Sequence, residues 1–196
     1  MGLGLRIRLS KTRVWLNVER ARLLDFLFGF EEVVTLVRRL DTASTQAVLK
    51  HFGAHIGRNC DIESGLTIHG ARGGFKNLTM EDDCHLGKQV FLDLTAPVQI
   101  RRACTISMRS MILTHFDPGH SRMEETKYKT YAAGVEIGPD AYFGAGVIVL
   151  PGVHIGEGSI LGAGAVIIRD VPPRSLAVGV PADSRSLRSA SEKAFS

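Results

Sequence analysis

The feature that most constrains this chain is a six-residue repeat between Val135 and Pro173. An aliphatic or aromatic residue stands at every sixth position, and a small or β-branched residue follows each one by four positions. The first set is Ile137, Phe143, Val149, Ile155, Leu161 and Ile167, and the second is Ala141, Val147, Val153, Ser159, Ala165 and Val171. A period of six fits neither a helix (about 3.6 residues) nor a half-buried strand (about two). It is typical of a solenoid whose hexads, each a short strand with a tight corner, form the sides of a triangular coil.

The same repeat begins much earlier in the chain. Nine further apolar residues open hexads, at Ile56, Ile62, Ile68, Met80, Leu86, Leu92, Ile100, Ile106 and Ile112. A glycine-containing interruption (Gly70–Gly74), two extra residues before Ile100 and a long gap after Ile112 shift the frame. We therefore expect a solenoid domain over residues 54–182, with the polar residues 114–134 as a protruding loop. Long loops on rigid scaffolds frequently carry function.

Residues 1–53 lack the repeat and are expected to form an accessory segment. Alternating apolar residues over residues 3–18 predict a short β-hairpin. From about Glu19, a helical stripe follows at Leu23, Leu27, Phe30, Val34 and Val37. Capping residues over Asp41–Ser44 predict a second short helix up to about Phe52. At the other end of the chain, residues 183–196 are expected to form a C-terminal helix or tail.

The charge distribution argues against nucleic-acid binding. The net charge of +4 lies entirely in residues 1–55, which hold nine Lys and Arg against five Asp and Glu. The solenoid is therefore neutral, and aromatic residues make up only 7% of the chain, so neither a basic groove nor a stacking platform is expected. No apolar run approaches the roughly 18 residues of a membrane span, and the N-terminus lacks the pattern of a secretory signal. We expect a cytoplasmic protein.

The basic, apolar N-terminal segment leaves two interpretations open. It fits an element that caps the solenoid or contacts another subunit, because terminal repeats would otherwise expose their core. It also fits a peripheral membrane contact through residues 1–40.

The three cysteines follow the repeat. Cys60, Cys84 and Cys104 each lie four residues after a hexad start, at the second inward position. Free cysteine behaves as a small buried residue, so the spacing favours core packing over a disulfide or a metal site. No C-x-x-C or H-x-x-H spacing is present, and no metal requirement is expected.

His115 is the histidine best placed for chemistry. It stands where the last regular coil opens into the polar loop, so its backbone is fixed while its side chain lies at the loop's base. An imidazole there suits a general base near neutral pH. The alternative is a loop histidine that is merely hydrogen-bonded to a turn.

Together these residues resemble the hexapeptide-repeat acyltransferases, and most closely the branch of galactoside, maltose and nodulation-type O-acetyltransferases. The resemblance is strongest from about Val90 to Ala182, and a His-x-Asp-Pro turn at His115 precedes its most specific stretch. It implies a left-handed parallel β-helix, an exception to the usual right-handed crossover. It also implies a homotrimer with active sites between subunits and acetyl-CoA as the acyl donor.

The resemblance also implies roles for individual residues. His115 matches the catalytic base, and Asp93 falls where relatives carry an acceptor-contacting Asn. The coenzyme A contacts are expected at Ala145, Ala163, Ile168, Arg169 and Arg185, with Arg188 as the alternative to Arg185. The sugar-binding segment of the branch is not recognisable in residues 1–52.

The expected function is acetyl-CoA-dependent O-acetylation of a hydroxyl on a sugar or surface-polysaccharide precursor, with His115 as general base. An amino-sugar amine or a small alcohol stays open as the acceptor. A non-catalytic scaffold subunit is one alternative. A γ-class carbonic anhydrase is another, although it needs three imidazoles on zinc, which the histidine spacing does not offer.

Overall fold

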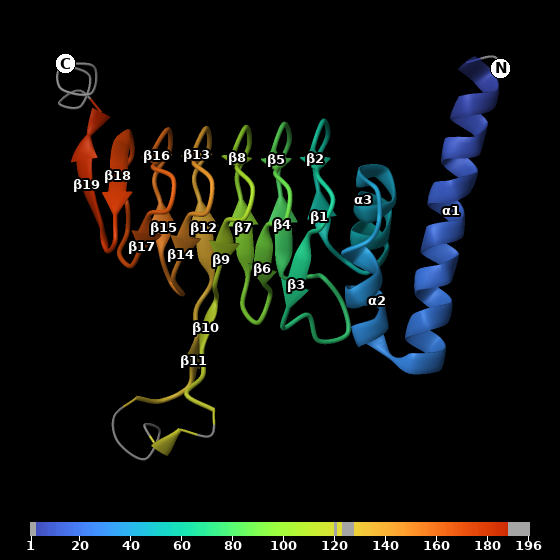
Figure 1. The fold of residues 1–196 in the computed structure, drawn as a ribbon, viewed down its shortest axis with the longest axis horizontal. Coiled ribbons are helices and arrows are strands. Elements are labelled where there is room, and N and C mark those ends of the chain that lie inside the picture. The colour runs from blue at the N-terminus through green and yellow to red at the C-terminus, as the bar shows by residue number, and fades with distance from the viewer. Residues whose placement is uncertain (1–2, 120, 123–127, 188–196) are drawn as a thin grey trace.

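The computed structural model describes residues 3–119, 121–122 and 128–187, with side chains from Ser10 onward. Three helices, α1 (Leu3–Phe28), α2 (Phe30–Val37) and α3 (Thr42–His51), lie at one end of an elongated parallel β-helix (Figure 1). None of the helices in this described part combines the length and apolarity that a bilayer crossing requires.

Three parallel sheets form the sides of the β-helix. The first sheet contains β1 (His55–Ile56), β4 (Leu78–Met80), β7 (Val98–Ile100), β12 (Val135–Ile137) and β15 (His154–Ile155). The second contains β2 (Asp61–Ile62), β5 (His85–Leu86), β8 (Thr105–Ile106), β13 (Tyr142–Phe143), β16 (Ile160–Leu161), β18 (Ser175–Gly179) and β19 (Ala182–Ser186). The third contains β3 (Thr67–His69), β6 (Phe91–Asp93), β9 (Met111–Ile112), β14 (Ile148–Val149) and β17 (Val166–Ile167). The predicted left-handed parallel β-helix is thereby confirmed.

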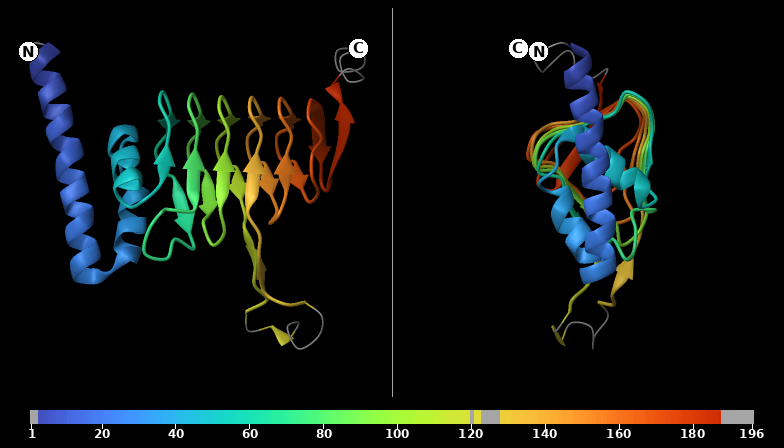
Figure 2. Two further views of the ribbon diagram at one scale, coloured as in Figure 1. Left: turned by 180° about the vertical axis from the view of Figure 1, so that it is seen from behind. Right: turned by 90° about the vertical axis from the view of Figure 1, so that its right-hand side faces the viewer.

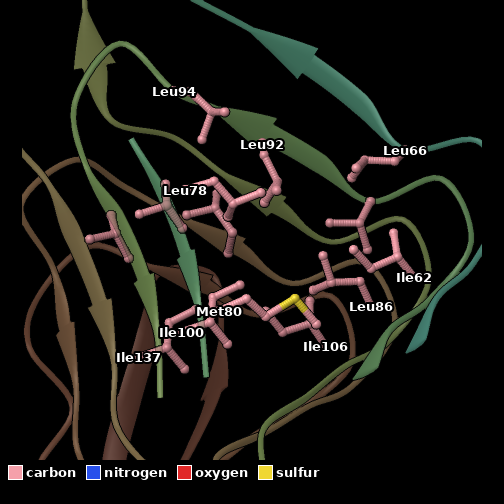
Figure 3. Packing of buried hydrophobic residues seen from close by; sticks show 14 of the residues in the cluster. Ile62, Leu66, Leu78, Met80, Leu86, Leu92, Leu94, Ile100, Ile106 and Ile137 are labelled. Atoms are coloured by element: carbon pink, nitrogen blue, oxygen red, sulfur yellow. The ribbon is translucent and has the colours of Figure 1, made fainter. Parts of the chain in front are cut away.

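The core is built from the hexad positions. All fifteen residues that open a hexad are buried, none more than 6% exposed. Figure 3 shows some of them, such as Leu86, Ile100 and Ile106, among other buried apolar side chains inside the coils. At the second inward position, Cys84 and Cys104 are buried and Cys60 is partly buried, and all three are free thiols. Each sulfur donates to a backbone carbonyl of the next coil, as Cys104 Sγ does to Gly138 O at 3.0 Å. The cysteines are core residues, as the spacing predicts.

The length of each coil shows where extra residues enter. Tyr142 pairs with Ile160, which is the 18-residue step of three hexads. Earlier steps are longer: Asp61 pairs with His85, His85 with Thr105, and Thr105 with Tyr142. In each of these three coils the surplus lies at the same corner, between a strand of the third sheet and the next strand of the first sheet. The longest surplus forms the antiparallel hairpin of β10 (His115–Phe116) and β11 (Tyr131–Ala132), which projects from the body (Figure 1).

The predicted N-terminal β-hairpin is wrong, because residues 3–18 belong to the continuous helix α1. The residues between the alternating runs, Ser10-Lys11-Thr12, contain no glycine or asparagine to close a tight turn. Leucine, arginine and lysine, which dominate the segment, are good helix formers. The predicted helical stripe is also only partly correct, since Leu23 and Leu27 are exposed while Val33, Leu36 and Val37 are buried.

Gly29 separates α1 from α2. Its φ of 92° and ψ of 168° lie outside the range of other residues, and the chain reverses there. Beyond it, α2 is held to the solenoid by an aromatic cluster in which Phe30 contacts Phe52 and Phe75, with ring centroids 5.3 and 5.0 Å away. The predicted cap of α3 is confirmed, because Asp41 accepts a hydrogen bond from the Ser44 N–H.

The predicted C-terminal helix is wrong over its first residues. Ala182–Ser186 form β19, which pairs antiparallel with β18. Serine and aspartate, which dominate this stretch, are weak helix formers, and the free edge of β18 offers a full ladder of hydrogen bonds. The remainder of the expected helix, including Arg188, lies outside the described residues.

Candidate active site

A cavity of about 540 Å³ lies at the corner where the extra residues leave the coils. Its walls come from α2, from the end of β3 and the interruption that follows it, and from the stem of the β10–β11 hairpin. The lining residues are Glu31, Val34, Ile68, His69, Gly70, Ala71, Arg72, Thr95, His115, Asp117, Thr130, Tyr131 and Ala132. This volume is in the usual range for a small-molecule site. The predicted general base, His115, therefore lies in the wall of a cavity of suitable size.

His115 is held by a buried carboxylate. Its Nδ1 lies 2.5 Å from Oδ2 of Asp93, and its backbone N–H donates to the same oxygen at 3.0 Å. Because a carboxylate accepts hydrogen bonds, this contact assigns the proton of the neutral imidazole to Nδ1. Nε2 then carries the lone pair, and His115 has the tautomer that a general base requires.

Asp93 is fully buried and its oxygens are saturated with donors. Oδ1 accepts from the backbone N–H and the hydroxyl of Thr95, at 3.0 and 2.7 Å, and Oδ2 also accepts from the Thr114 N–H at 2.8 Å. Burial alone would raise the pKa of Asp93, but the hydrogen bonds from Thr95, His115 and the Thr114 backbone outweigh it and hold the pKa well below its usual range. The carboxylate is therefore ionised at neutral pH.

The structure places Asp93 beneath His115 and not at the cavity surface. The resemblance implies an acceptor contact for this residue, but its side chain is 1% exposed and is not part of the cavity lining. The cavity side of the pair is formed by Thr95 and by Gly70. A Cβ at Gly70 would lie 2.2 Å from the Thr95 hydroxyl, so only glycine fits against this residue.

His69 is the site residue that sequence reasoning leaves unplaced. It pairs in register with Asp93 across β3 and β6, and its ring stacks on that of His115 with centroids 5.3 Å apart and planes 19° apart. Residues 69, 93 and 115 come together only because the coils between them contain surplus residues. A strict 18-residue period does not predict that these residues lie side by side. The one feature of the sequence that could have singled out His69 is its position next to the Gly70–Gly74 interruption.

The ligand atoms of His69, Asp93 and His115 lie within 4.8 Å of one another, which makes the cluster a candidate metal site. A metal needs lone pairs that converge on one point. The two imidazole planes are nearly parallel, and Asp93 already accepts from four groups besides the His115 ring. This geometry fits a stacked histidine pair, with the His115 ring hydrogen-bonded to Asp93, better than a cation site.

The expected donor-contacting residues fall on two corners of the solenoid. Ala145 and Ala163 stack at the corner between the second and third sheets, where the Gly164 N–H donates to Ala145 O at 2.9 Å. A Cβ at the neighbouring Gly146 or Gly164 would meet nothing within 4 Å, so this corner is an open strip of small residues. Ile168 and Arg169 are exposed at the corner after β17, at the other end of the third-sheet strands. One copy of the chain does not bring the two pairs together.

Arg169 lines a smaller cavity of about 190 Å³ together with Asp170 and Asp183 from β19. Arg185 is exposed on the same strand but is not part of that lining. The two arginines are therefore not joined in one site within a single chain.

The repeat itself matches a known family. Residues 134–169 fit the model described as bacterial transferase hexapeptide (six repeats), and these residues form β12 through β17 of the structure. Residues 134–169 therefore carry the hexapeptide repeat that this model describes. A 61-residue stretch of the chain is 52% identical to a candidate acetyltransferase of Schizosaccharomyces pombe, covering 28% of the chain and 30% of the relative. A candidate acetyltransferase of Staphylococcus aureus strain COL is 58% identical over 50 residues, 26% of the chain and 25% of the relative. These matches span less than a third of either relative's length.

Solved structures resemble nearly the whole chain in fold. A hexapeptide-repeat containing acetyltransferase from Vibrio cholerae superposes with a TM-score of 0.69 at 22% identity, over 89% of this chain and 93% of that one. A maltose O-acetyltransferase from Clostridium difficile 630 gives 0.61 at 20% identity, over 87% of each chain. A galactoside acetyltransferase in complex with coenzyme A gives 0.55 at 20% identity, over 100% and 96%. At these identities the likeness shows the shared fold.

Proposed function

We propose that this protein is an acetyl-CoA-dependent O-acetyltransferase that acts on a hydroxyl of a sugar or surface-polysaccharide precursor. The observation that carries the proposal is the His115–Asp93 pair in the wall of the corner cavity, with Nδ1 protonated and Nε2 free to accept a proton. Acetyl transfer is favoured over other acyl chemistry because the relatives matched over the repeat are named as acetyltransferases.

The proposed reaction is a direct transfer. Nε2 of His115 takes the proton of the acceptor hydroxyl as its oxygen attacks the thioester carbonyl. The tetrahedral intermediate then collapses, the C–S bond breaks, and the coenzyme A thiolate takes the proton from His115. Asp93 stabilises the transient imidazolium, because its ionised carboxylate touches Nδ1 throughout. General-base help of this kind is typically worth about 10²–10⁴ in rate.

The cavity offers groups that suit a polyol. The carboxylates of Glu31 and Asp117 can accept from sugar hydroxyls, and Arg72 and His69 can donate to them. Tyr131, half-exposed and stacked on Phe116 with ring centroids 5.8 Å apart, gives a flat apolar surface at the hairpin stem. Asp93 acts here by positioning His115, and we assign it no contact with the acceptor.

The separation of the donor-contacting residues supports a homotrimer with sites between subunits. If the Ala145–Ala163 corner of one copy faced the Ile168–Arg169 corner of the next, a groove would form with small residues on one wall. The pantetheine arm could lie along that strip, with Arg169 and Arg185 near the phosphates. No single chain forms this groove, because one corner lies before the third-sheet strands and the other lies after them, at their opposite ends.

The test is a thiol-release assay with acetyl-CoA over a panel of mono- and oligosaccharide acceptors, an amino sugar and a small alcohol. We expect turnover with a sugar hydroxyl, and a fall of at least about 100-fold in His115→Ala with acetyl-CoA binding retained. His55→Ala is the matched control, since His55 is exposed on β1 of the first sheet and is not part of the cavity lining. Unchanged turnover in His115→Ala would overturn the mechanism.

Binding of acetyl-CoA, measured together with turnover, distinguishes an enzyme from a non-catalytic scaffold. Acetyl-CoA that binds only the folded state must raise the melting temperature. Thermal stabilisation with no turnover on any acceptor would support the acetyl-CoA site and contradict the proposed acceptor class. The absence of both stabilisation and turnover would favour a non-catalytic scaffold subunit.

A further inference from the structure

Helix α1 carries apolar residues on two opposite faces, and only one of these faces packs against the rest of the molecule. The used face packs on α2 and α3 through Val18, Leu24 and the fully buried Ala21. Polar contacts fix the same face, since Asn17 donates to the Ser44 hydroxyl at 2.9 Å and Arg13 pairs with Asp41 at 3.2 Å. The helix is therefore firmly placed on the molecule over these residues.

The opposite face is open. It bears the residues Trp15, Leu16, Leu23, Phe26 and Leu27, all exposed, which we call the outer stripe. At about 100° per residue, all five fall on the side of the helix away from Ala21. Trp15 is 60% exposed and Phe26 is 86% exposed. Figures 1 and 2 both show α1 as the outermost element at this end of the molecule, so no described element covers the stripe.

Basic residues border the outer stripe on both sides. Lys11 and Arg22 project along one edge of the helix, and Arg13 and Arg20 along the other, as the helical spacing requires. Glu19 is the acidic residue within the stripe, and Arg22 pairs with it at 2.9 Å. The outer stripe is thus a band of large apolar side chains, two of them aromatic, with Lys11 on one border and Arg20 on the other. Arg13 and Arg22, on the same borders, are paired with Asp41 and Glu19.

We infer that α1 lies on an anionic lipid surface, with the outer stripe among the acyl chains near the headgroups and its basic borders on the phosphates. Apolar burial and attraction to anionic lipids act together in helices of this pattern. A second copy of α1 fits the surface less well, because pairing two outer stripes would bring their basic borders against each other. The inference is independent of acetyl transfer and concerns where the protein works.

The chain contains its own probe for this contact, because Trp15 is its single tryptophan. The full-length protein would be mixed with vesicles of phosphatidylcholine, alone or with about one third phosphatidylglycerol, and followed by Trp emission and co-sedimentation. We expect a blue shift of the emission and sedimentation with the anionic vesicles only. Raising NaCl from about 0.05 to 0.5 M should weaken the binding, since the screening length shortens several-fold.

Two variants test the two parts of the surface. Lys11→Glu with Arg20→Glu should weaken binding to the anionic vesicles by at least about tenfold, and Leu23→Ser with Phe26→Ser should abolish the sedimentation. Lys76→Glu with Arg102→Glu is the matched control, because it reverses the same charge at exposed positions on the solenoid.

Equal binding by the Lys11→Glu, Arg20→Glu double variant and its control would overturn the inference, as would an unshifted Trp emission with anionic vesicles. Protection of Trp15 from acrylamide quenching without lipid, in wild type but not in Leu23→Ser with Phe26→Ser, would show that another copy covers the stripe. That result would also overturn it.

Discussion

At the scale of single residues, Asp93 links the stability of the corner to its chemistry. The fully buried carboxylate receives hydrogen bonds from two side chains and from three backbone N–H groups of Thr95, Thr114 and His115. It ties the coil of β6 to the coil of β9 at the point where the long loop departs. The same contacts set the tautomer of His115, so the ring is oriented before any substrate arrives.

Asp93→Asn should therefore destabilise the protein in a pH-dependent way. The native pKa of Asp93 lies below its unfolded value of about 3.9, so the ionised carboxylate stabilises the fold above that pH and loses this contribution as the pH falls below about 4. Urea unfolding should show a loss of about 2–3 kcal/mol in Asp93→Asn at pH 7, and a narrowing gap to wild type below pH 4. Asp61→Asn, an exposed carboxylate beside His85, should cost under about 1 kcal/mol at either pH. A gap that stays constant from pH 7 to pH 3 would contradict the assignment.

His69→Asn should act on the acceptor and not on the fold. On the proposed function, His69 presents a ring nitrogen to the cavity, and one lost hydrogen bond typically costs about 1 kcal/mol, or roughly fivefold. We expect the KM for the sugar to rise by about that factor or more, with a smaller change in the KM for acetyl-CoA. Steady-state kinetics with each substrate varied in turn would show this. An unchanged KM for the acceptor would remove His69 from the binding site.

The two histidines differ in how far sequence could predict them. His115 is identifiable because the repeat visibly stops beside it and because the resemblance covers that turn. His69 lies 46 residues away in the chain, and it reaches His115 only because the coils between them are longer than 18 residues by amounts that hydrophobic periodicity does not fix. The resemblance also points to Asp93, and the structure shows its side chain buried beneath His115 and outside the cavity lining.

At the scale of elements, the hexads could be predicted residue by residue and the N-terminal helix could not. Every hexad must place one large and one small side chain in the coil interior, so the sequence pattern determines which residues of each hexad point inward. Helix α1 has apolar residues on both faces, and its alternation of leucine and arginine fits a strand and a two-faced helix equally well. Its conformation is decided by helix propensity and by packing on α2 and α3, which no short-range pattern records.

Gly29→Ala should loosen the junction of α1 and α2. The backbone of Gly29, with φ of 92° and ψ of 168°, is essentially restricted to glycine, and an alanine there costs about 1–3 kcal/mol although its Cβ would meet nothing within 4 Å. We expect the melting temperature to fall by roughly 2–8 °C, measured by circular dichroism. Ser10→Ala, at an exposed position of α1, is the control and should be neutral. An unchanged melting temperature in Gly29→Ala would mean that the junction adapts without strain.

The buried cysteines predict low thiol reactivity. A hydrogen bond with Cys84 and burial together raise the pKa of Cys104, and burial raises that of Cys60, so neither thiol forms the reactive thiolate at neutral pH. Titration with a thiol-specific reagent should label no more than one cysteine in the native protein within minutes and three in denaturant. Rapid labelling of Cys104 in the native state would contradict the described core.

At the scale of the whole molecule, the exposed apolar residues of the second sheet predict how copies assemble. Tyr142 and Ile160 are register partners on neighbouring strands, and both are exposed although they are large and apolar. If the proposed trimer buries them, light scattering should give three times the chain mass of 21.3 kDa. Tyr142→Glu with Ile160→Glu should then shift the mass toward the monomer and lower turnover, because the donor groove would be split. Lys50→Glu, at an exposed position of α3, should keep the wild-type mass.

The corner that collects the surplus residues divides the molecule into two parts that can change separately. Three successive coils place their extra residues there, and the strands on either side still pair in register with their neighbours. The ladder therefore keeps its rise whether the corner holds two extra residues or a long hairpin. On the proposed function, the loops at the acceptor corner could be exchanged between proteins of this architecture, in evolution or by design, without altering the strip of small residues at the other end of the third-sheet strands. Such an exchange would change the acceptor while the acyl donor stayed the same.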